Sequence, residues 1–380
     1  MATDQMQHHD VIVIGAGVAG ASVALRLARI GVDVLLVDRA TFPRRTVCGC
    51  CLNPRSLAQL ESLGVLDVIR AAGARPTRHL EVRGFGRHIT RSIPAGLSFS
   101  RSQLDLLLVN AGRRAGVTFH DGTSATVETE FSDDRRVVRI GSARHSASMV
   151  IIADGLGGSS LREIPEMAPT IRRGAVIGVA TTVPDHADLP VDTISMCTTT
   201  HGYVGFARIE GHRIDCAAAI DPTWLRAVGG PAAAVAHIID ETNGPSLDLE
   251  QADWFGTGRL TRHRTRCAAH RLCVIGDAAG YVEPFTGEGM AWAFEAGALV
   301  APIAAAARDD WSQRQEHAWQ RAYDRHIRRR QRWCRLLART VRHPRRMRAA
   351  MTLLHHAPWL AAPVMRSTAT SRWMRAEVAT

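Results

Sequence analysis

Residues 11–38 read VIVIGAGVAGASVALRLARIGVDVLLVD. A short apolar run turns through the glycines at 15, 17 and 20 into a helical stretch, and a second apolar run ends on Asp38. A strand, a glycine turn, a helix and a second strand that ends in an acid have the order and spacing that a dinucleotide needs. The stretch therefore predicts an α/β fold with a parallel sheet and a nucleotide at the glycine turn.

Each motif residue has a physical role in such a site. Gly15 permits the tight turn, Gly17 lets backbone amides approach a pyrophosphate, and Gly20 lets the helix pack close to the strand. The positive end of the helix then faces the phosphates. Asp38 lies near the distance at which a carboxylate meets a ribose 2′-hydroxyl, which disfavours a 2′-phosphate. The nucleotide is expected to be NAD or FAD. A purely structural turn is the alternative.

Composition narrows the class of protein. The 380 residues, 46% of them hydrophobic, suit a globular enzyme with two closely packed domains. The polar start and eight scattered cysteines favour reduced thiols and a cytoplasmic location. Cys48 and Cys51 form a CxxC without a second pair, so no metal site is expected. All 47 basic residues are arginine, which excludes Schiff-base, pyridoxal-phosphate and P-loop chemistry.

Two later motifs repeat the pattern of an acid after a buried strand. Asp154-Gly155 occurs in VIIADGLGGSSLR, and Gly276-Asp277 occurs in LCVIGDAAGYVEPFTGEGM. Both acids fall at the carboxyl end of a predicted strand, where cofactors lie in such sheets. Between them, the short strands of residues 166–266 predict a separate antiparallel sheet, and residues 54–72 predict one amphipathic helix.

These three motifs together resemble the FAD-dependent group of para-hydroxybenzoate-hydroxylase-like monooxygenases, geranylgeranyl-reductase-like enzymes and flavin-dependent halogenases, over residues 10–305. The resemblance implies a Rossmann-like, three-layer FAD-binding domain of the glutathione-reductase type, an inserted α+β antiparallel-sheet substrate domain and a C-terminal helical tail. The implied bounds are 1–75, 98–165 and 266–306 for the FAD-binding domain, 76–97 and 166–265 for the substrate domain, and 307–380 for the arginine-rich tail.

The resemblance also assigns residues to the cofactor. Arg101 would touch FAD, Asp154 would lie near the flavin and pyrophosphate, and Asp277 would meet a ribityl hydroxyl. The segment 284–290 would run beneath the isoalloxazine, with its amides aimed at the N1 and O2 side, where reduced flavin carries negative charge. Glu288 in this turn could equally be a solvated first-turn acid. The full cofactor-binding set is Gly15, Gly17, Gly20, Asp38, Arg39, Arg101, Asp154, Gly155, Gly276, Asp277, Gly287, Glu288 and Gly289.

The electron donor has no domain of its own in this sequence. One dinucleotide fingerprint occurs, so NADH or NADPH would dock transiently, or a separate reductase would supply electrons to the flavin.

The reaction type stays open between two branches. Halogenases of this group use a lysine and a Trp-x-Trp-x-Ile-Pro stretch, both absent here. A monooxygenase would form a flavin hydroperoxide in a dry pocket and attack an aromatic or polyketide-type substrate, with His201 as base and Tyr203 positioning the substrate oxygen. A reductase of carbon–carbon double bonds would use Cys48 or Tyr203 as proton donor. The notable Cys50-Cys51 pair departs from the glycine-rich continuation usual in the reductases, so the monooxygenase is favoured.

The C-terminal region carries the charge of the whole chain. Residues 321–348 contain twelve arginines and one acid, a net charge of +11, which is also the net charge of the full sequence. Apolar residues at helical spacing from Trp319 to Val341 predict a helix with one buried face. Packing against the FAD-binding domain with the arginines in water is one interpretation, and peripheral contact with an anionic membrane is the other. A non-catalytic protein that binds a partner through this tail is a third possibility, and no nucleic-acid recognition motif is present.

Overall fold

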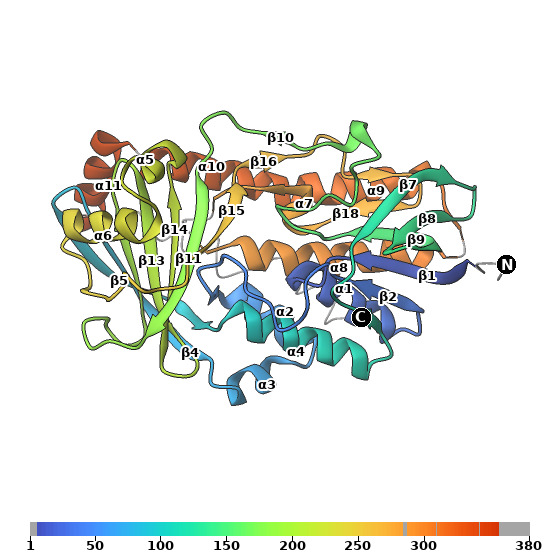
Figure 1. Ribbon diagram of the computed structural model, residues 1–380, viewed down its shortest axis with the longest axis horizontal. Coiled ribbons are helices and arrows are strands. Elements are labelled where there is room, and N and C mark those ends of the chain that lie inside the picture. The colour runs from blue at the N-terminus through green and yellow to red at the C-terminus, as the bar shows by residue number, and fades with distance from the viewer. Residues whose placement is uncertain (1–5, 284–286, 309, 342, 357–380) are drawn as a thin grey trace.

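The computed structural model describes residues 6–283, 287–308, 310–341 and 343–356, which form two large sheets side by side along the long axis (Figure 1). The first sheet has the order β17-β18-β9-β1-β2-β6, in which β1, β2, β6, β9 and β18 run parallel. Its strands are β1 (Gln7–Ile14), β2 (Val34–Val37), β6 (Thr118–His120), β9 (Ala143–Ile152), β17 (Ala268–Ala269) and β18 (Leu272–Val274).

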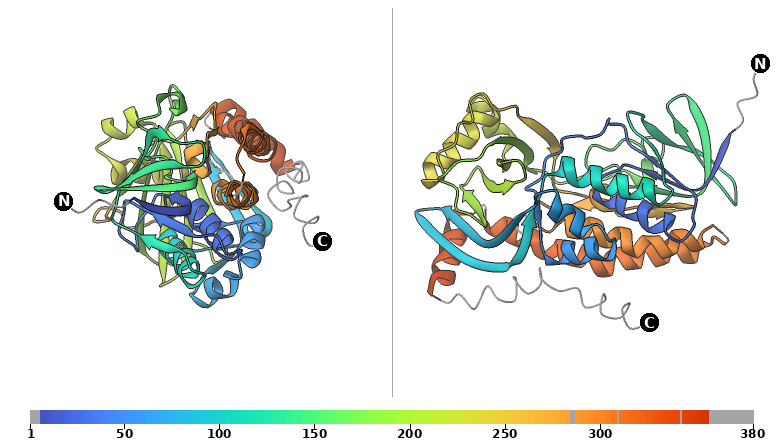
Figure 2. Two further views of the ribbon diagram at one scale, coloured as in Figure 1. Left: turned by 90° about the vertical axis from the view of Figure 1, so that its right-hand side faces the viewer. Right: turned by 90° about the horizontal axis from the view of Figure 1, so that it is seen from below.

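The apolar runs of the sequence form the centre of this sheet because both of its faces are covered. Helices α1 (Val18–Ala28), α4 (Arg101–Arg114) and α8 (Gly289–Ala306) pack together against one side. The strands β7 (Ala125–Phe131) and β8 (Arg136–Ile140) extend from β9 as an antiparallel meander. In the end view of Figure 2 the meander and these helices lie on opposite sides of the sheet. The predicted three-layer α/β class is confirmed.

The second sheet is largely antiparallel and has the order β15-β11-β14-β13-β12-β4-β5-β3. Its strands are β3 (Cys51–Leu52), β4 (Arg75–Gly84), β5 (Arg87–Ser98), β11 (Ile177–Pro184), β12 (Thr193–Thr198), β13 (Gly202–Ile209), β14 (Arg213–Ile220) and β15 (Phe255–Arg259). Side chains alternate between its faces. Val204 and Phe206 join a core under α5 (Pro222–Ala227) and α6 (Pro231–Thr242), whereas Tyr203 faces the opposite side.

A small sheet joins the two large ones. It consists of β10 (Thr170–Ile171), β16 (Arg262–His263) and β19 (Gly280–Tyr281), in that order. Strand β19 follows α7 (Gly276–Ala279), so the chain passes from the end of the parallel sheet directly to this junction. The residues after β18 are thereby held between both large sheets.

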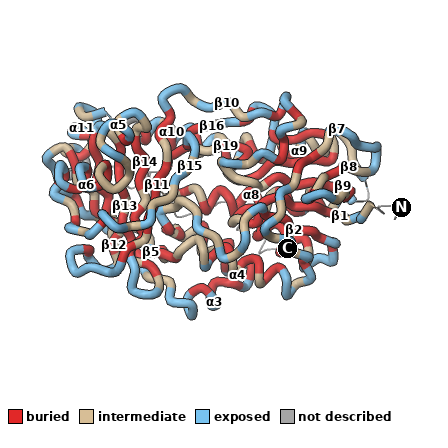
Figure 3. Tube along the Cα trace, in the orientation of Figure 1, coloured by how far each residue is buried: buried red, intermediate tan, exposed pale blue. Residues whose placement is uncertain are grey.

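The C-terminal helices run along one side of the molecule (Figure 2). They comprise α9 (Gln313–Tyr323), a π-helical turn over Asp324–Arg328, α10 (Arg329–Val341) and α11 (Pro344–His356). The indole of Trp319 is buried and donates to the Val274 carbonyl at 3.1 Å. The tail therefore packs on the parallel sheet through one face, whereas most of its arginines are exposed or half-buried (Figure 3).

One predicted helix is divided in the structure, and one long apolar helix lies in its core. The predicted helix over residues 54–72 is divided into α2 (Pro54–Ser62) and α3 (Leu66–Ala71), because Gly64 takes a φ of +56° and ends the first helix. Among the described residues, α8 is long and apolar enough to span a membrane, but 61% of it is buried and it packs against α1, α2 and α9. It lies in the core of this structure.

Candidate functional site

The candidate site lies where the parallel strands of the first sheet end. Strands β1, β2, β9 and β18 are adjacent and point the same way, so the residues that follow them share one edge. These residues are Gly15, Asp38, Asp154 and Gly276-Asp277. In the sequence, Asp38, Asp154 and Asp277 are each more than 100 residues from the next. Their three motifs are nevertheless neighbours at the edge of the sheet where cofactors bind.

The glycine turn is held too closely for side chains. Gly15 has a φ of +102°, and a Cβ there would lie 2.4 Å from the Ala153 carbonyl oxygen. A Cβ on Gly20 would lie 1.8 Å from the Gly15 carbonyl oxygen, so α1 packs directly on the turn. Gly17 is the N-cap of α1, and no side chain caps it. The first amides of α1 therefore remain available to an anion.

Two guanidinium groups lie over this turn. A Cβ on Gly17 would be 3.2 Å from Arg44 Nη2 and 3.3 Å from Arg101 Nη2. Arg101 is fixed by Asp105, which accepts from its Nε at 2.9 Å and from its Nη2 at 2.8 Å. Arg44 lies 3.3 Å from the same carboxylate. Two cations facing an uncapped helix N-terminus fit the pyrophosphate of a dinucleotide.

Asp38 is buried beside the turn and its two oxygens are occupied by backbone. Its Oδ2 accepts from the Ala16 amide at 2.8 Å, and its Oδ1 accepts from the Ala40 amide at 2.9 Å. The neighbouring Arg39 donates to the Gly157 carbonyl at 3.1 Å, on the loop after β9. Asp38 therefore tightens the turn itself, and the expected contact of Asp38 with a ribose hydroxyl stays a prediction.

The Asp154 carboxylate points along its own loop. Oδ2 accepts from the amide and hydroxyl of Ser160 at 3.1 and 2.5 Å, and Oδ1 has no hydrogen-bond partner within the described part of the chain. Its backbone adjoins Gly15, and Gly155 follows with a φ of +69°. Burial raises the pKa of Asp154. The Asp-Gly turn lies beside the glycine turn, with one carboxylate oxygen left for a further donor.

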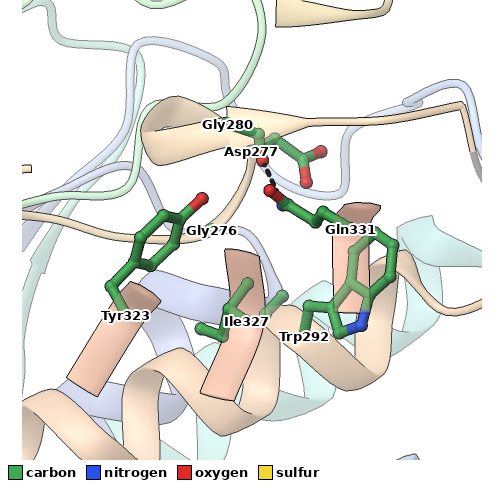
Figure 4. Close-up of a pocket in the computed structure, with 8 residues that line it drawn as sticks. Gly276, Asp277, Gly280, Trp292, Tyr323, Ile327 and Gln331 are labelled. Atoms are coloured by element: carbon green, nitrogen blue, oxygen red, sulfur yellow. Dashed lines mark hydrogen bonds between the residues drawn. The ribbon is translucent and has the colours of Figure 1, made fainter. Parts of the chain in front are cut away.

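Asp277 is close enough to Arg101 and Arg262 for their charges to act on its carboxylate. Burial raises its pKa to about 6, and the two arginines oppose that rise. Behind it, a small cavity separates the Gly276-Asp277 turn from the tail helices (Figure 4). Gln331 of α10 donates to the Gly280 carbonyl at 2.9 Å across this cavity. The tail thus supports the strand end that carries Asp277.

The segment predicted to run beneath the flavin is described from Gly287 onward, and residues 284–286 lie outside the described residues. Gly287 has a φ of +67°, and Gly289 begins α8. Glu288 is buried, with its Oε2 3.5 Å from Arg55 Nη1, so it is not the solvated acid of the alternative interpretation. Burial also raises the pKa of Glu288. The turn is therefore anchored by a buried ion pair.

Cys48 lies beside Arg101 on the loop that precedes β3. Cys50 takes a φ of +53°, and its amide is 3.3 Å from Cys48 Sγ. A hydrogen bond from Cys50 and the charge of Arg101 lower the pKa of Cys48 to about 6 against the effect of burial. At this pKa the Cys48 sulfur is expected to be deprotonated at neutral pH. Asp215 of β14 lies near the same cysteines, and burial raises its pKa.

This assignment predicts the pH dependence of alkylation. In flavin-free protein, the rate of carboxamidomethylation of Cys48 by iodoacetamide should rise with a midpoint at about pH 6, because only the thiolate reacts. Arg101→Gln should move the midpoint to higher pH, whereas Arg45→Gln, at an exposed guanidinium paired with Asp253, should leave it in place. Mass spectrometry of the Cys48 peptide measures both. A midpoint near the ordinary cysteine value of about 8.5 would contradict the assignment.

Tyr203 lies on the site side of the second sheet and His201 does not. Tyr203 is buried in an apolar cluster, called here the Tyr203 cluster, which includes Ile89, Val176, Met196, Ala219, Leu260, Met347 and Met351. Tyr281 packs against it, and the pKa of Tyr281 is raised by burial and by Asp277, Tyr203 and Cys48. His201 instead stacks on Trp224 at 4.5 Å between ring centroids. The structure brings Cys48 and Tyr203 to the cofactor motifs and leaves His201 apart.

Several residues of the site were not in the predicted set. Asp105 is placed by its i,i+4 spacing to Arg101 on α4, a signal that was visible in the sequence. Arg262 and Tyr281 come from strands β16 and β19, whose pairing is not visible in the local pattern. Arg44 comes from the loop before β3 and lies on the glycine turn.

Comparison with known proteins shows the family to which this chain belongs. The family described as "FAD binding domain" matches residues 8–315. Menaquinone reductase of Mycobacterium tuberculosis strain H37Rv is 28% identical over 331 residues, which cover 77% of this chain and 76% of that protein. Rifampicin monooxygenase of Rhodococcus hoagii is 26% identical over 303 residues, which cover 74% of this chain and 60% of that protein.

Among solved structures, the myxobacterial chondrochloren halogenase CndH superposes with a TM-score of 0.75, covering 86% of this chain and 82% of that one. The sequence identity of this pair is 19%, so the likeness shows a shared fold.

Proposed function

This chain belongs to the FAD binding domain family and is an FAD-dependent oxidoreductase, and from that premise we propose that it is a monooxygenase acting on an aromatic or polyketide-type small molecule. Reduced FAD activates O2 in such enzymes, one oxygen atom entering the substrate and the other leaving as water. The chain itself must hold the cofactor, exclude water and position the substrate.

The observation that carries the proposal is the position of the Tyr203 cluster. It is built from apolar side chains of both the second sheet and α11, and it is buried. Tyr281, which packs against it, is close enough to Asp277 and Cys48 for their charges to raise its pKa. Such surroundings exclude water, which would otherwise consume the activated oxygen. Because burial raises the pKa of Tyr281, its phenol stays protonated and can donate to an oxygen of the substrate. Tyr203 is the second candidate for that contact.

The relatives support the same reaction in part. Rifampicin monooxygenase is among the proteins that match three quarters of this chain, and oxygen insertion into an aromatic compound is consistent with a site that combines phenols and apolar side chains. NADH or NADPH is proposed as a transiently bound reductant, because one dinucleotide fingerprint is present. A separate reductase is the alternative donor. All eight cysteines lie in the described part of the chain and none forms a disulfide there, which supports the proposed cytoplasmic location.

A second candidate is a reductase of carbon–carbon double bonds. Menaquinone reductase matches 77% of this chain, and this similarity favours a reductive reaction. The proton donor would then be Tyr203, because the Cys48 sulfur is expected to be deprotonated at neutral pH. Hydride would be delivered to one carbon and the phenolic proton to the other.

Exclusion of oxygen separates the two candidates. The probes are rifampicin, simple phenols and menaquinone. Enzyme reduced anaerobically should convert none of these compounds until O2 is admitted. The product formed then should carry one atom from isotopically labelled O2, as measured by mass spectrometry. A product reduced by two electrons and formed without O2 would contradict the monooxygenase and support the reductase. In that event Tyr203→Phe should lower its rate about 10²–10⁴-fold, the usual contribution of a general acid.

A further inference from the structure

The C-terminal helices present two different faces along their length. A buried face is formed by Trp319, Tyr323, Ile327, Gln331, Cys334 and Ala338, which recur at every third or fourth residue. An exposed face on the other side recurs with the same spacing. It is called here the basic face, and it is formed by Arg314, His317, Arg321, Arg325, Arg329, Arg332, Trp333 and Leu336.

Arginine dominates the basic face within the described part of the chain. None of its five arginines forms an ion pair with any other residue that the structure describes. The two acids of these helices lie beside the face and have partners of their own. Glu316 is 3.4 Å from Arg266, and Asp324 is 2.6 Å from Arg328. A row of five unpaired guanidinium groups along three helical segments makes a strongly positive surface.

Large apolar side chains lie on the same face. Trp333 is 65% exposed and Leu336 is 51% exposed, one and four residues after Arg332. On α11, which continues the tail, Leu353 is 54% exposed, and Arg345, Arg346 and Arg348 of the same helix are exposed. A nucleic acid or an acidic protein would complement the arginines alone. An exposed indole and leucines among arginines match the interface of an anionic bilayer, where aromatic and aliphatic groups enter the headgroup region.

We propose that the basic face binds the surface of an anionic lipid membrane, with the arginines on the headgroups and Trp333, Leu336 and Leu353 in the interfacial region. Helices α9 and α10 run along one side of the molecule (Figure 2). The inner side of α11 places Met347 and Met351 in the Tyr203 cluster. One helix therefore contacts the site through its inner side and the membrane through its outer side.

Vesicle flotation with the full-length, FAD-loaded protein tests the proposal. Binding to phosphatidylcholine vesicles that contain phosphatidylglycerol should exceed binding to phosphatidylcholine alone by at least about tenfold. The triple change Arg325→Glu, Arg329→Glu and Arg332→Glu should lower that binding at least about tenfold. The matched control Arg87→Glu, Arg113→Glu and Arg114→Glu reverses three exposed arginines elsewhere and should bind as the parent does.

A second variant tests the apolar part. Trp333→Ser with Leu336→Ser leaves every charge in place and should lower binding to the anionic vesicles severalfold, with the loss persisting at high salt. The FAD content of each variant reports whether it is folded, independently of its activity. Equal losses for the two triple variants would overturn the proposal. So would duplex DNA that displaces the vesicles while the Trp333→Ser, Leu336→Ser variant binds them as the parent does, because the face would then be a site for polyanions.

Discussion

Replacing Gly17 by valine should leave a folded protein that binds FAD at least about 100-fold more weakly, a loss of about 2.7 kcal/mol. Gly17 has a φ of −75° and a ψ of −173°, which valine adopts without strain. The atoms nearest to its Cβ would be the side-chain ends of Arg44, Arg101 and Asp105, at 3.2, 3.3 and 4.0 Å. The branched side chain would occupy the space between the α1 amides and these guanidinium groups, where the pyrophosphate is expected to lie.

Titration of the purified protein with FAD, followed by quenching of flavin fluorescence, measures the loss. Gly256→Val is the matched control, since Gly256 is exposed in β15 and its Cβ would be in ordinary contact with Gly178 and Val179, at 3.5 and 3.8 Å. It should bind FAD as the parent does. Gly20→Ala should behave differently from both, because its Cβ would lie 1.8 Å from backbone and unfolding would accompany the loss of FAD. Unchanged affinity in a folded Gly17→Val variant would remove the glycine turn from the site.

Neutralising Glu295 should lower the free energy of unfolding by about 3–5 kcal/mol. The carboxylate is fully buried in α8 and accepts from Arg55 Nε at 2.9 Å and from Arg330 Nη1 at 2.8 Å. In Glu295→Gln both guanidinium groups lose their charge partner, and Arg55 is itself buried. The remaining acid near Arg55 is Glu288, at 3.5 Å, which compensates in part.

Urea unfolding of the FAD-loaded protein measures this change. Glu316→Gln is the matched control, because Glu316 pairs at 3.4 Å with a half-exposed Arg266, and its loss should change the free energy by about 0–1 kcal/mol. Since Arg55 also contacts Glu288 in the turn predicted to face the flavin, Glu295→Gln should weaken FAD binding as well. Equal effects of the two substitutions would show that the buried network is not a structural requirement.

The sequence identified the parts of the site whose signal is local. The glycine turn, Asp38, and the strands that end at Asp154 and Asp277 are each recognisable within about a dozen residues, and a parallel sheet must bring such strand ends to one edge. The Arg55–Glu295–Arg330 network joins residues 240 and 35 positions apart. No local periodicity contains that information, because it depends on how α2, α8 and α10 pack.

The candidate residues His201 and Tyr203 illustrate a second limit of prediction from the sequence. In a regular strand, residues 201 and 203 would point to the same face. Gly202 takes a φ of +155° at the start of β13, and this turn sends His201 to Trp224 while Tyr203 faces Tyr281. The tail shows the same limit in a milder form. Its helical period predicted one buried face, and packing on the FAD-binding domain was one of two interpretations, but the exposed position of Trp333 required the structure.

The flavin content of the purified protein, reconstituted with FAD if necessary, tests the central claim most directly. The account predicts one tightly bound FAD per chain, seen as a resolved flavin absorption spectrum that persists after gel filtration and disappears in Gly17→Val. A folded protein that shows no flavin absorption after reconstitution, or that retains equal FAD when Gly17 is replaced, would contradict it.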